Sequence, residues 1–193
     1  LFSSAASDVY KRQVLGDGKP KYLNSPETPL FSKSHELYGL HHIRKFAKNL
    51  SRIVVVEGYM DVIALAQFGI HYAVATLGTS VGKPHLKMLF RRVDQVVFCF
   101  DGDEAGRKAA FRGMEAALPM MEDGRQVKFL FLPEGEDPDS VVRNKGSQHL
   151  EHLFDHADPL ETFLFDQMTQ GIDLDTMDGL SLIHISEPTR LTS

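Results

Sequence analysis

Three apolar runs of the sequence each end abruptly in carboxylates. Residues 53–56 lead into Glu57, residues 95–100 lead into Asp101-Gly102-Asp103, and residues 126–132 lead into a cluster that contains Glu134, Glu136, Asp137 and Asp139. Oxygen ligands of this kind select Mg²⁺ or Mn²⁺ rather than zinc, and open carboxylate sites bind such ions jointly with phosphates. The pattern therefore indicates metal-assisted phosphoryl chemistry, provided that the three ends meet.

A single glycine separates the two acids of the middle run. We expect Gly102 to let the backbone turn, so that Asp101 and Asp103 can face one cation. Asp61 follows Glu57 by four residues, a spacing that can place both on one face of a helix. If five of these carboxylates lie within about 10 Å of one another, repulsion must raise some of their pKa values, or divalent cations must balance their charge.

The elements that position these acids alternate between strands and helices. Apolar runs predict strands at 53–56, 72–77, 95–100 and 126–132, and helical spacing predicts helices at 34–49, 59–68, 84–92, 103–121, 137–144, 147–156 and 159–170. The short connections predict an α/β fold with a mostly parallel four-stranded sheet flanked by helices. In such sheets ligands bind beyond the carboxyl ends of the strands, where all three acidic clusters fall.

Composition limits the class of protein. Hydrophobic residues make up 42% of the chain, which suffices for a core. No apolar run approaches the roughly 20 residues of a membrane span. The single cysteine, Cys99, is predicted to be a buried packing residue in a reducing cytoplasm. The net charge of −5 divides into +5 over residues 1–52 and −10 over residues 53–193. This asymmetry suits solvation alone, or a protein that holds nucleic acid with one part and cations with another.

The chain divides into five predicted segments. Residues 1–13 and 181–193 lack helical and strand periodicity and resemble translated adapter sequence, so we expect the natural protein to continue beyond both. Residues 14–50 are predicted to form a basic arm (residues 14–34) and a connecting helix. Residues 51–145 are predicted to form the α/β domain, and residues 146–180 the start of a helical subdomain.

Several local patterns admit two interpretations. The acidic clusters are either a solvated surface or a metal site. Arg107 and Lys108 either offset the nearby acids or contact a nucleotide phosphate. The basic arm is either a solvated linker or a surface that holds phosphate and base, and its candidate contacts are Lys21, Tyr22, Asn24 and Lys33.

Two familiar motifs are rejected. Asp101-Gly102-Asp103 could open an EF-hand loop, but the twelfth position of that loop is Arg112 instead of glutamate. The stretch 78–83 resembles a phosphate-binding loop, but its glycine spacing is one residue short and Pro84 follows the lysine where Ser or Thr is needed.

Three motifs as a set resemble the Toprim domain, a Rossmann-like fold. They are Val56-Glu57-Gly58-Tyr59-Met60-Asp61-Val62, Cys99-Phe100-Asp101-Gly102-Asp103-Glu104-Ala105-Gly106-Arg107 and Gly135-Glu136-Asp137-Pro138-Asp139. Two further stretches narrow the resemblance to bacterial replicative DNA primases of the DnaG type, namely Lys21-Tyr22-Leu23-Asn24-Ser25-Pro26-Glu27-Thr28 and Leu77-Gly78-Thr79. The resemblance covers roughly residues 14–179.

The resemblance implies a nucleotidyltransferase that synthesises short RNA primers on single-stranded DNA from ribonucleoside triphosphates, with two Mg²⁺ or Mn²⁺ ions. It implies catalytic roles for Glu57, Asp101 and Asp103. The implied metal ligands are Glu57, Asp61, Asp101, Asp103, Asp137 and Asp139. Lys21, Tyr22 and Asn24 match the family's basic arm, which contacts template or incoming nucleotide.

Members of this family act at the replisome in the bacterial cytoplasm, bind zinc through an N-terminal domain and contact the replicative helicase through a C-terminal domain. We expect both domains to lie outside this fragment, whose activity by itself is left open. Residues 80–85 also depart from the family's usual sequence. Two alternatives are another Toprim nuclease or topoisomerase, and a Toprim module that only binds DNA or a partner. No tyrosine lies in a DNA-gate domain, and retention of the motif acids argues against a pure binding module.

Overall fold

The computed structural model of the chain describes residues 11–13, 22–24, 32–46 and 50–169. Most of the predicted basic arm and nearly all of the predicted adapter sequence lie outside these ranges. In the described part before residue 32, β1 (Lys11–Gln13) pairs antiparallel with β2 (Tyr22–Asn24). A short 3₁₀ turn, η1 (Lys33–His35), follows.

Six strands form one sheet in the order β3-β5-β4-β6-β7-β8. The four central strands run parallel, and they are β4 (Arg52–Val56), β5 (Ala73–Thr76), β6 (Gln95–Phe100) and β7 (Gln126–Phe131). Two short antiparallel strands border them, β3 (Leu37–Tyr38) beside β5 and β8 (Asp158–Pro159) beside β7. The predicted parallel four-stranded sheet is confirmed, with a short strand added on each side.

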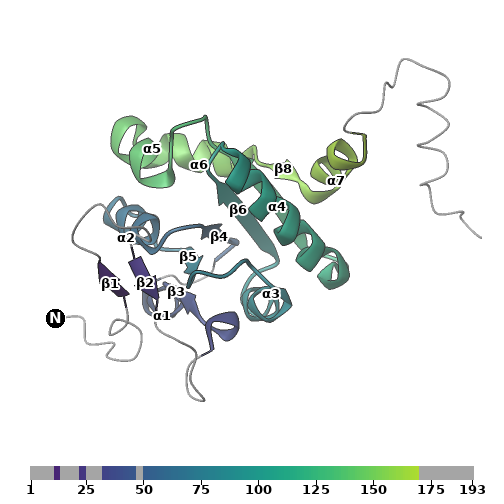
Figure 1. Cartoon of the computed structure of the whole chain (residues 1–193), viewed down its shortest axis with the longest axis horizontal. Helices are drawn as coiled ribbons and strands as arrows, with labels where there is room; N and C mark the ends of the chain where they lie inside the picture. Colours follow the sequence, from purple (N-terminus) through teal and green to yellow (C-terminus); the bar gives the residue numbers. More distant parts are fainter. Residues whose placement is uncertain (1–10, 14–21, 25–31, 47–49, 170–193) are drawn as a thin grey trace, which may run out of the picture.

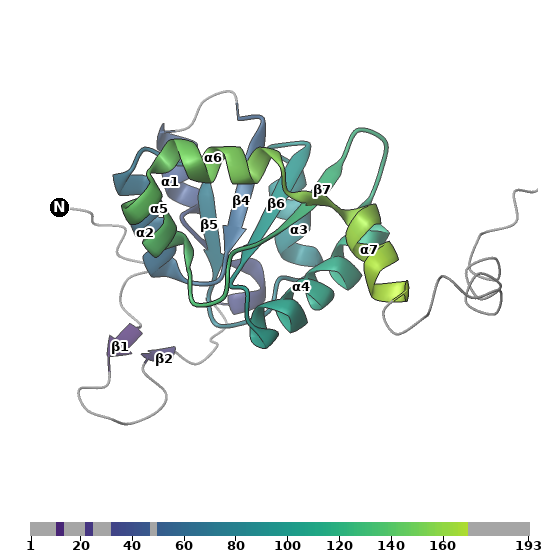
Figure 2. The same cartoon turned by 90° about the horizontal axis from the view of Figure 1, so that it is seen from above.

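Helices cover both faces of the sheet (Figures 1 and 2). One face packs against α3 (Lys83–Phe90), α4 (Glu104–Ala117) and α7 (Leu160–Thr169), and the other against α2 (Tyr59–Gln67), α5 (Pro138–Lys145) and α6 (Ser147–Asp155). Side chains of β4 alternate between the two cores, since Val55 joins the first and Val54 and Val56 the second. Burial on both faces explains why the strands are continuously apolar.

Stacked phenylalanines join β6, β7 and α7 on the first face. The ring of Phe98 lies 5.3 Å from that of Phe129, and Phe129 lies 4.6 Å from Phe163 of α7. Phe98 and Phe129 are fully buried. Aromatic contacts of this size stabilise packing beyond the area that they bury, so they fix α7 against the sheet.

The helix that follows the basic arm is shorter than predicted. The spacing at 34–49 predicted one helix, but Leu37 and Tyr38 pair with β5 and α1 spans only Leu40–Phe46. Gly39 separates the two with φ +86°, a conformation that favours glycine, and a Cβ there would lie 2.6 Å from the Ala73 carbonyl oxygen. The helical spacing was misleading because Leu37 and Leu40 reach the same core from two different elements.

The predicted helix at 103–121 also ends early. α4 stops at Ala117, and Pro119 lies in a 3₁₀ turn, η2 (Leu118–Met120), because proline cannot donate the next helical hydrogen bond. The helices predicted at 137–144, 147–156 and 159–170 correspond to α5, α6 and α7. Among the helices of the described residues, none is long and apolar enough to cross a membrane.

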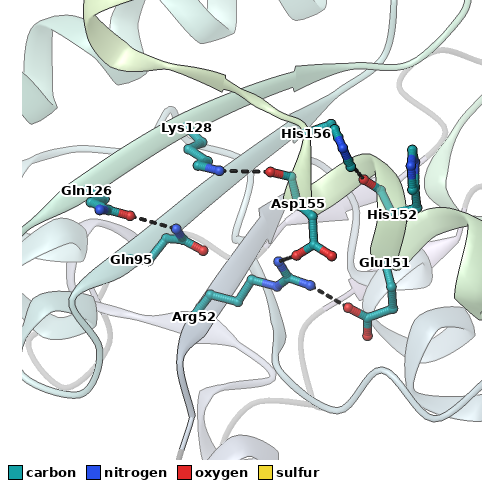
Figure 3. Close-up of polar contacts among 8 residues, drawn as sticks. All are labelled: Arg52, Gln95, Gln126, Lys128, Glu151, His152, Asp155 and His156. Carbon is teal, nitrogen blue, oxygen red and sulfur yellow. Dashed lines mark hydrogen bonds and ion pairs between the residues drawn. The ribbon is translucent and has the colours of Figure 1, made fainter.

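Arg52 begins β4 at the amino end of the sheet and ties it to α6 (Figure 3). Its guanidinium donates to Glu151 Oε2 and Asp155 Oδ1, each at 2.5 Å. Lys128 of β7 donates to the backbone carbonyl of Asp155 at 2.9 Å. The Arg52 side chain is only 12% exposed, whereas its partners Glu151 and Asp155 are 37% and 60% exposed. The paired arginine anchors α6 at the end of the sheet remote from the acidic clusters.

Candidate active site at the carboxyl end of the sheet

Glu57 and Asp61 flank the connection from β4 to α2. Glu57 follows the last strand residue, and Gly58 is the N-cap of α2, so Glu57 lies outside the helix. The expectation that both acids share a helix face is therefore wrong, because the helix begins only at Tyr59. Asp61 instead turns back, and its Oδ2 accepts the N–H of Gly58 at 3.1 Å.

The pKa values of both acids are raised. Burial, together with the charges of Asp137 and Asp101, raises the pKa of Asp61 to about 6. Glu57 is exposed at the strand end, yet partial desolvation and then the charges of Asp101 and Asp103 raise its pKa. Because the charge of Asp137 raises the pKa of Asp61, the first and third acidic runs lie close together in the folded chain.

Asp101 and Asp103 occupy the connection from β6 to α4. Asp101 is half-buried, and burial followed by the charges of Asp137 and Asp103 raises its pKa. Asp103 is the N-cap of α4, where its Oδ1 accepts the N–H of Gly106 at 2.7 Å. One oxygen of Asp103 is thus used to cap the helix, and the capping bond fixes the orientation of the carboxylate.

Gly102 and Gly106 of this turn lie too close to neighbouring backbone to carry a side chain. A Cβ at Gly102 would lie 2.1 Å from the Leu132 carbonyl oxygen, and one at Gly106 would lie 2.2 Å from the Asp101 carbonyl oxygen. We expected Gly102 to provide freedom to turn, but it is not among the glycines with positive φ. Its absent side chain instead lets the Asp101–Asp103 turn press against the residues that follow β7.

The third acidic cluster lies between β7 and α5. Asp137 is the N-cap of α5, and its Oδ1 accepts the N–H of Ser140 at 2.7 Å. Asp139 is ion-paired with Arg143 one turn later. Glu136 lies 3.5 Å from the Lys145 ammonium, and the hydrogen bond from Ser140 lowers its pKa. Of this cluster, Asp137 is the residue whose charge reaches Asp61 and Asp101.

The structure therefore brings five of the six predicted metal ligands into one electrostatically coupled group. They are Glu57, Asp61, Asp101, Asp103 and Asp137, while the Asp139 carboxylate is turned toward Arg143. Within the described ranges, no three His, Cys, Asp or Glu side chains lie close enough together to hold a metal ion. Their all-oxygen chemistry suits Mg²⁺ or Mn²⁺, and their role as ligands stays a prediction.

The predicted cationic contacts are only partly described. Arg107 lies over the Phe131 ring at 5.5 Å, and Lys108 pairs with Glu104 at 2.7 Å along the helix. Lys33 lies in η1. Lys21 is outside the described residues, and for Tyr22 and Asn24 the structure gives only their places in β2.

The acidic residues lie at the starts of three helices. The N-termini of α2, α4 and α5 follow Glu57, Asp103 and Asp137. A helix N-terminus carries partial positive charge and free backbone N–H groups, which favour phosphate. The site therefore combines carboxylates for a cation with helix ends that suit an anion.

Two polar contacts escaped the sequence analysis. Arg112 of α4 donates to Ser80 Oγ at 3.3 Å, which joins α4 to the loop after β5. His85 of α3 is fully buried and bonded at both ring nitrogens. The bonds of Arg112 to Ser80 and of His85 to Lys33 could not be predicted, because these partners lie in remote segments. The bond of His85 to the Gly82 N–H is local, and its capping-box spacing at the start of a helix is a signal that could have been found. Cys99 is free and buried, as predicted, and burial raises the pKa of its thiol.

Similarity to known proteins agrees with this geometry. The Toprim-like family matches residues 54–142, and the N-terminal domain of the DNA primase catalytic core matches residues 10–44. The DNA primase of Pseudomonas putida is 57% identical over 168 residues, which are 86% of this chain and 26% of that protein. The DNA primase of Escherichia coli K12 is 53% identical over 167 residues, which are 86% of this chain and 29% of that protein.

A solved structure of the DnaG primase catalytic domain bound to ssDNA has a TM-score of 0.84 with this chain at 50% identity, and the match covers 92% of this chain and 58% of that one. The chain belongs to the DnaG-type bacterial DNA primases. The resemblance inferred from the three acidic motifs is thereby confirmed. The chain spans under a third of the length of these curated primases, so it represents one part of the primase architecture.

Proposed function

We propose that this chain forms the catalytic centre of a DNA primase that joins ribonucleotides into short RNA primers on a single-stranded DNA template. The observation that carries the proposal is the electrostatic coupling of Glu57, Asp61, Asp101 and Asp137, which come from three separate strand ends. Repulsion among these carboxylates destabilises the folded state, so a site that gathers them is best explained by a positively charged ligand.

The donor set fits Mg²⁺ or Mn²⁺. Asp101, Asp103, Asp137 and Asp139 are the proposed ligands, with Glu57 and Asp61 in support. When bound, such ions would activate an attacking hydroxyl and stabilise the leaving pyrophosphate. The capping bonds of Asp103 and Asp137 use one carboxylate oxygen each and leave the other available.

The chain's own residues contribute proton handling and orientation. Desolvation and the charge of Asp101 raise the pKa of Glu57, which makes this carboxylate a stronger base for the proton of the 3′-hydroxyl of the growing primer. The N-termini of α2, α4 and α5 would orient nucleotide phosphates toward the carboxylates. Lys33, Arg107 and Lys108, together with Lys21, Tyr22 and Asn24, are the proposed contacts for template and nucleotide phosphate.

A chimera tests the proposal in a full-length protein. The matching 168-residue segment of the Pseudomonas putida primase is replaced by that of this chain, and incorporation of labelled ribonucleotides on a single-stranded template is measured. Asp101→Asn and Asp103→Asn are expected to remove primer synthesis while circular dichroism stays unchanged. Asp123→Asn is the matched control, because Asp123 is exposed in the turn before β7, at the amino end of the sheet.

Two results would overturn the proposal. One is full primer synthesis by both site variants. The other is an inactive but folded chimera whose parent primase is active under the same conditions.

Mn²⁺ binding gives an independent readout on the chain itself. Calorimetric titration is expected to show Mn²⁺ bound by the wild type and weakened by Asp101→Asn, but not by Asp123→Asn. Equal binding by all three chains would place the ion elsewhere.

A further inference from the structure

His85 is a buried titratable residue for which the proposed chemistry has no use. Its exposed fraction is 1%, and it lies in the first turn of α3. α3 follows β5 through the loop at 77–82, so its first turn lies at the carboxyl end of the sheet, with the acidic site. A polar ring is costly to bury unless its nitrogens are bonded, so the partners of His85 indicate what the residue does.

Both ring nitrogens have partners, and the partners determine the tautomer. Nδ1 lies 3.2 Å from the backbone nitrogen of Gly82, which can only donate, so Nδ1 accepts. Nε2 lies 3.0 Å from the carbonyl oxygen of Lys33, which can only accept, so Nε2 carries the proton and donates. Burial lowers the pKa of His85, in agreement with a neutral ring.

The two bonds connect segments that are far apart in sequence. Gly82 is the N-cap of α3, so the Nδ1 bond completes the start of the helix. The Nε2 bond spans 52 residues and reaches η1, at the end of the basic arm. The bonds of Ser32, in contrast, are local, since its Oγ lies 2.9 Å from Ser34 Oγ and its carbonyl accepts from the His35 N–H.

We propose that His85 is a positioning residue that fixes the backbone of Lys33 beside the start of α3, so that the Lys33 ammonium can contact a phosphate at the carboxyl end of the sheet. The phosphate belongs to the incoming nucleotide or to the template strand. This inference rests on the proposed primase function for its phosphate partner, but the anchor itself does not. Without the anchor, a lysine at the end of the arm must be ordered at the moment of binding, which weakens the interaction.

Paired substitutions separate the two bonds of the ring. In His85→Gln the side-chain amide can reach the position of Nε2 and still donate to Lys33. In His85→Asn the amide oxygen can replace Nδ1 and keep the helix cap, but the bond to Lys33 is lost. In the active chimera, His85→Asn is expected to raise KM for nucleotide, or Kd for single-stranded DNA, about fivefold with kcat within about twofold, and His85→Gln less so.

The two binding constants identify which phosphate is involved. Met88→Leu in the same helix is the control and should change neither constant. If the role of His85 were only to cap α3, His85→Gln would be the more damaging variant, and that order would overturn the proposal.

A double-mutant cycle tests whether His85 acts through Lys33. On a Lys33→Ala background, His85→Asn should add no further change in KM or Kd, because the positioned group is already gone. An undiminished effect on that background would contradict the proposal.

The anchor can be measured without any catalytic readout. In His85→Asn, hydrogen exchange is expected to speed up in the backbone around residues 33–36 while amides of the core strand β6 stay protected. In unsubstituted chain labelled with ¹⁵N, His85 should be the neutral tautomer protonated at Nε2. A ring protonated at Nδ1, or no change in exchange, would overturn the anchor, whereas an inactive unsubstituted chimera would overturn only the primase function.

Discussion

Asp61 combines two features: it is half-buried, as Asp101 is, and it accepts a backbone hydrogen bond, from Gly58. Burial and the charges of Asp137 and Asp101 raise its pKa to about 6, well above the ordinary value of 3.8. The folded state therefore favours protonated Asp61. Stability from this residue is fully present below its unfolded pKa and is lost as the pH rises through the folded value.

Asp61→Asn isolates this effect, because asparagine is a permanently neutral side chain of the same shape. With EDTA present, the variant should be more stable than the wild type by ~1–2 kcal/mol at pH 7, allowing for partial solvent screening. The difference should shrink toward zero at pH 4. Urea unfolding across this pH range provides the measurement. If the stability difference between the two chains stayed constant from pH 4 to pH 7, ionisation of Asp61 would not destabilise the fold.

For Asp103 and Asp137, the position in the fold was predictable from the sequence, but one of their roles was not. Both were expected at strand ends because acidic residues follow the apolar runs, and both lie there. Their second role, as caps of the helices that follow, was not predicted. The bond of His85 to Lys33 could not be predicted, because Lys33 lies 52 residues away and only the folded chain brings them together.

At the scale of elements, α4 contains two glycines that differ in whether a side chain would fit. A Cβ at Gly106 would lie 2.2 Å from the Asp101 carbonyl oxygen, whereas one at Gly113 would meet only Phe98 and Phe129 ring atoms at 3.7–3.8 Å. The first glycine allows the helix to start directly against the acidic turn. The second is an ordinary helix position with room for a methyl group.

Alanine substitutions should therefore shift stability in opposite directions. Gly106→Ala is expected to cost about 1–3 kcal/mol because backbone must move, and Gly113→Ala is expected to gain up to about 1 kcal/mol from helix propensity. Chemical denaturation of the two variants compares them within one helix. Destabilisation of similar size in both would mean that helix packing, and not the turn, sets the requirement for glycine.

The main elements were predictable where their pattern was long or fully apolar. The strands at 53–56 and 95–100 were recognised because both of their faces are buried. The helix at 34–49 was not, because Leu37 reaches the core from a strand, and β3 and β8 are only two residues long. Such short strands gain their stability from β5 and β7, so local sequence carries little signal for them.

At the scale of the whole molecule, stability and the candidate site occupy opposite ends of one sheet. The acidic residues gather at the carboxyl end, where their mutual repulsion is unfavourable. The amino end carries the ion pairs of Arg52 with Glu151 and Asp155. In the strand order β5-β4-β6-β7, the inner strand β4 connects the two ends. Arg52 of the ion pairs is its first residue, and Glu57 of the candidate site follows its last.

Arg52→Met tests this separation. The methionine keeps apolar packing near Tyr72 and Phe154, over whose rings the guanidinium lies at 5.8 and 5.7 Å, but it removes both ion pairs. We expect a loss of about 1–2 kcal/mol, limited because Glu151 and Asp155 can be rehydrated. Arg91→Met, at an exposed position after α3, should change stability by less than about 0.5 kcal/mol.

The decisive readout combines stability with the site at the other end of the sheet. Under conditions where Arg52→Met remains folded, the pH dependence attributed to Asp61 and the affinity for Mn²⁺ should match the wild type. Because the central strands are packed on both faces, loss of the α6 anchor is expected to loosen the amino end without moving the strand ends that carry Glu57 and Asp101. A weaker Mn²⁺ affinity in Arg52→Met would instead show that α6, through its contact with α5, transmits the anchor to Asp137.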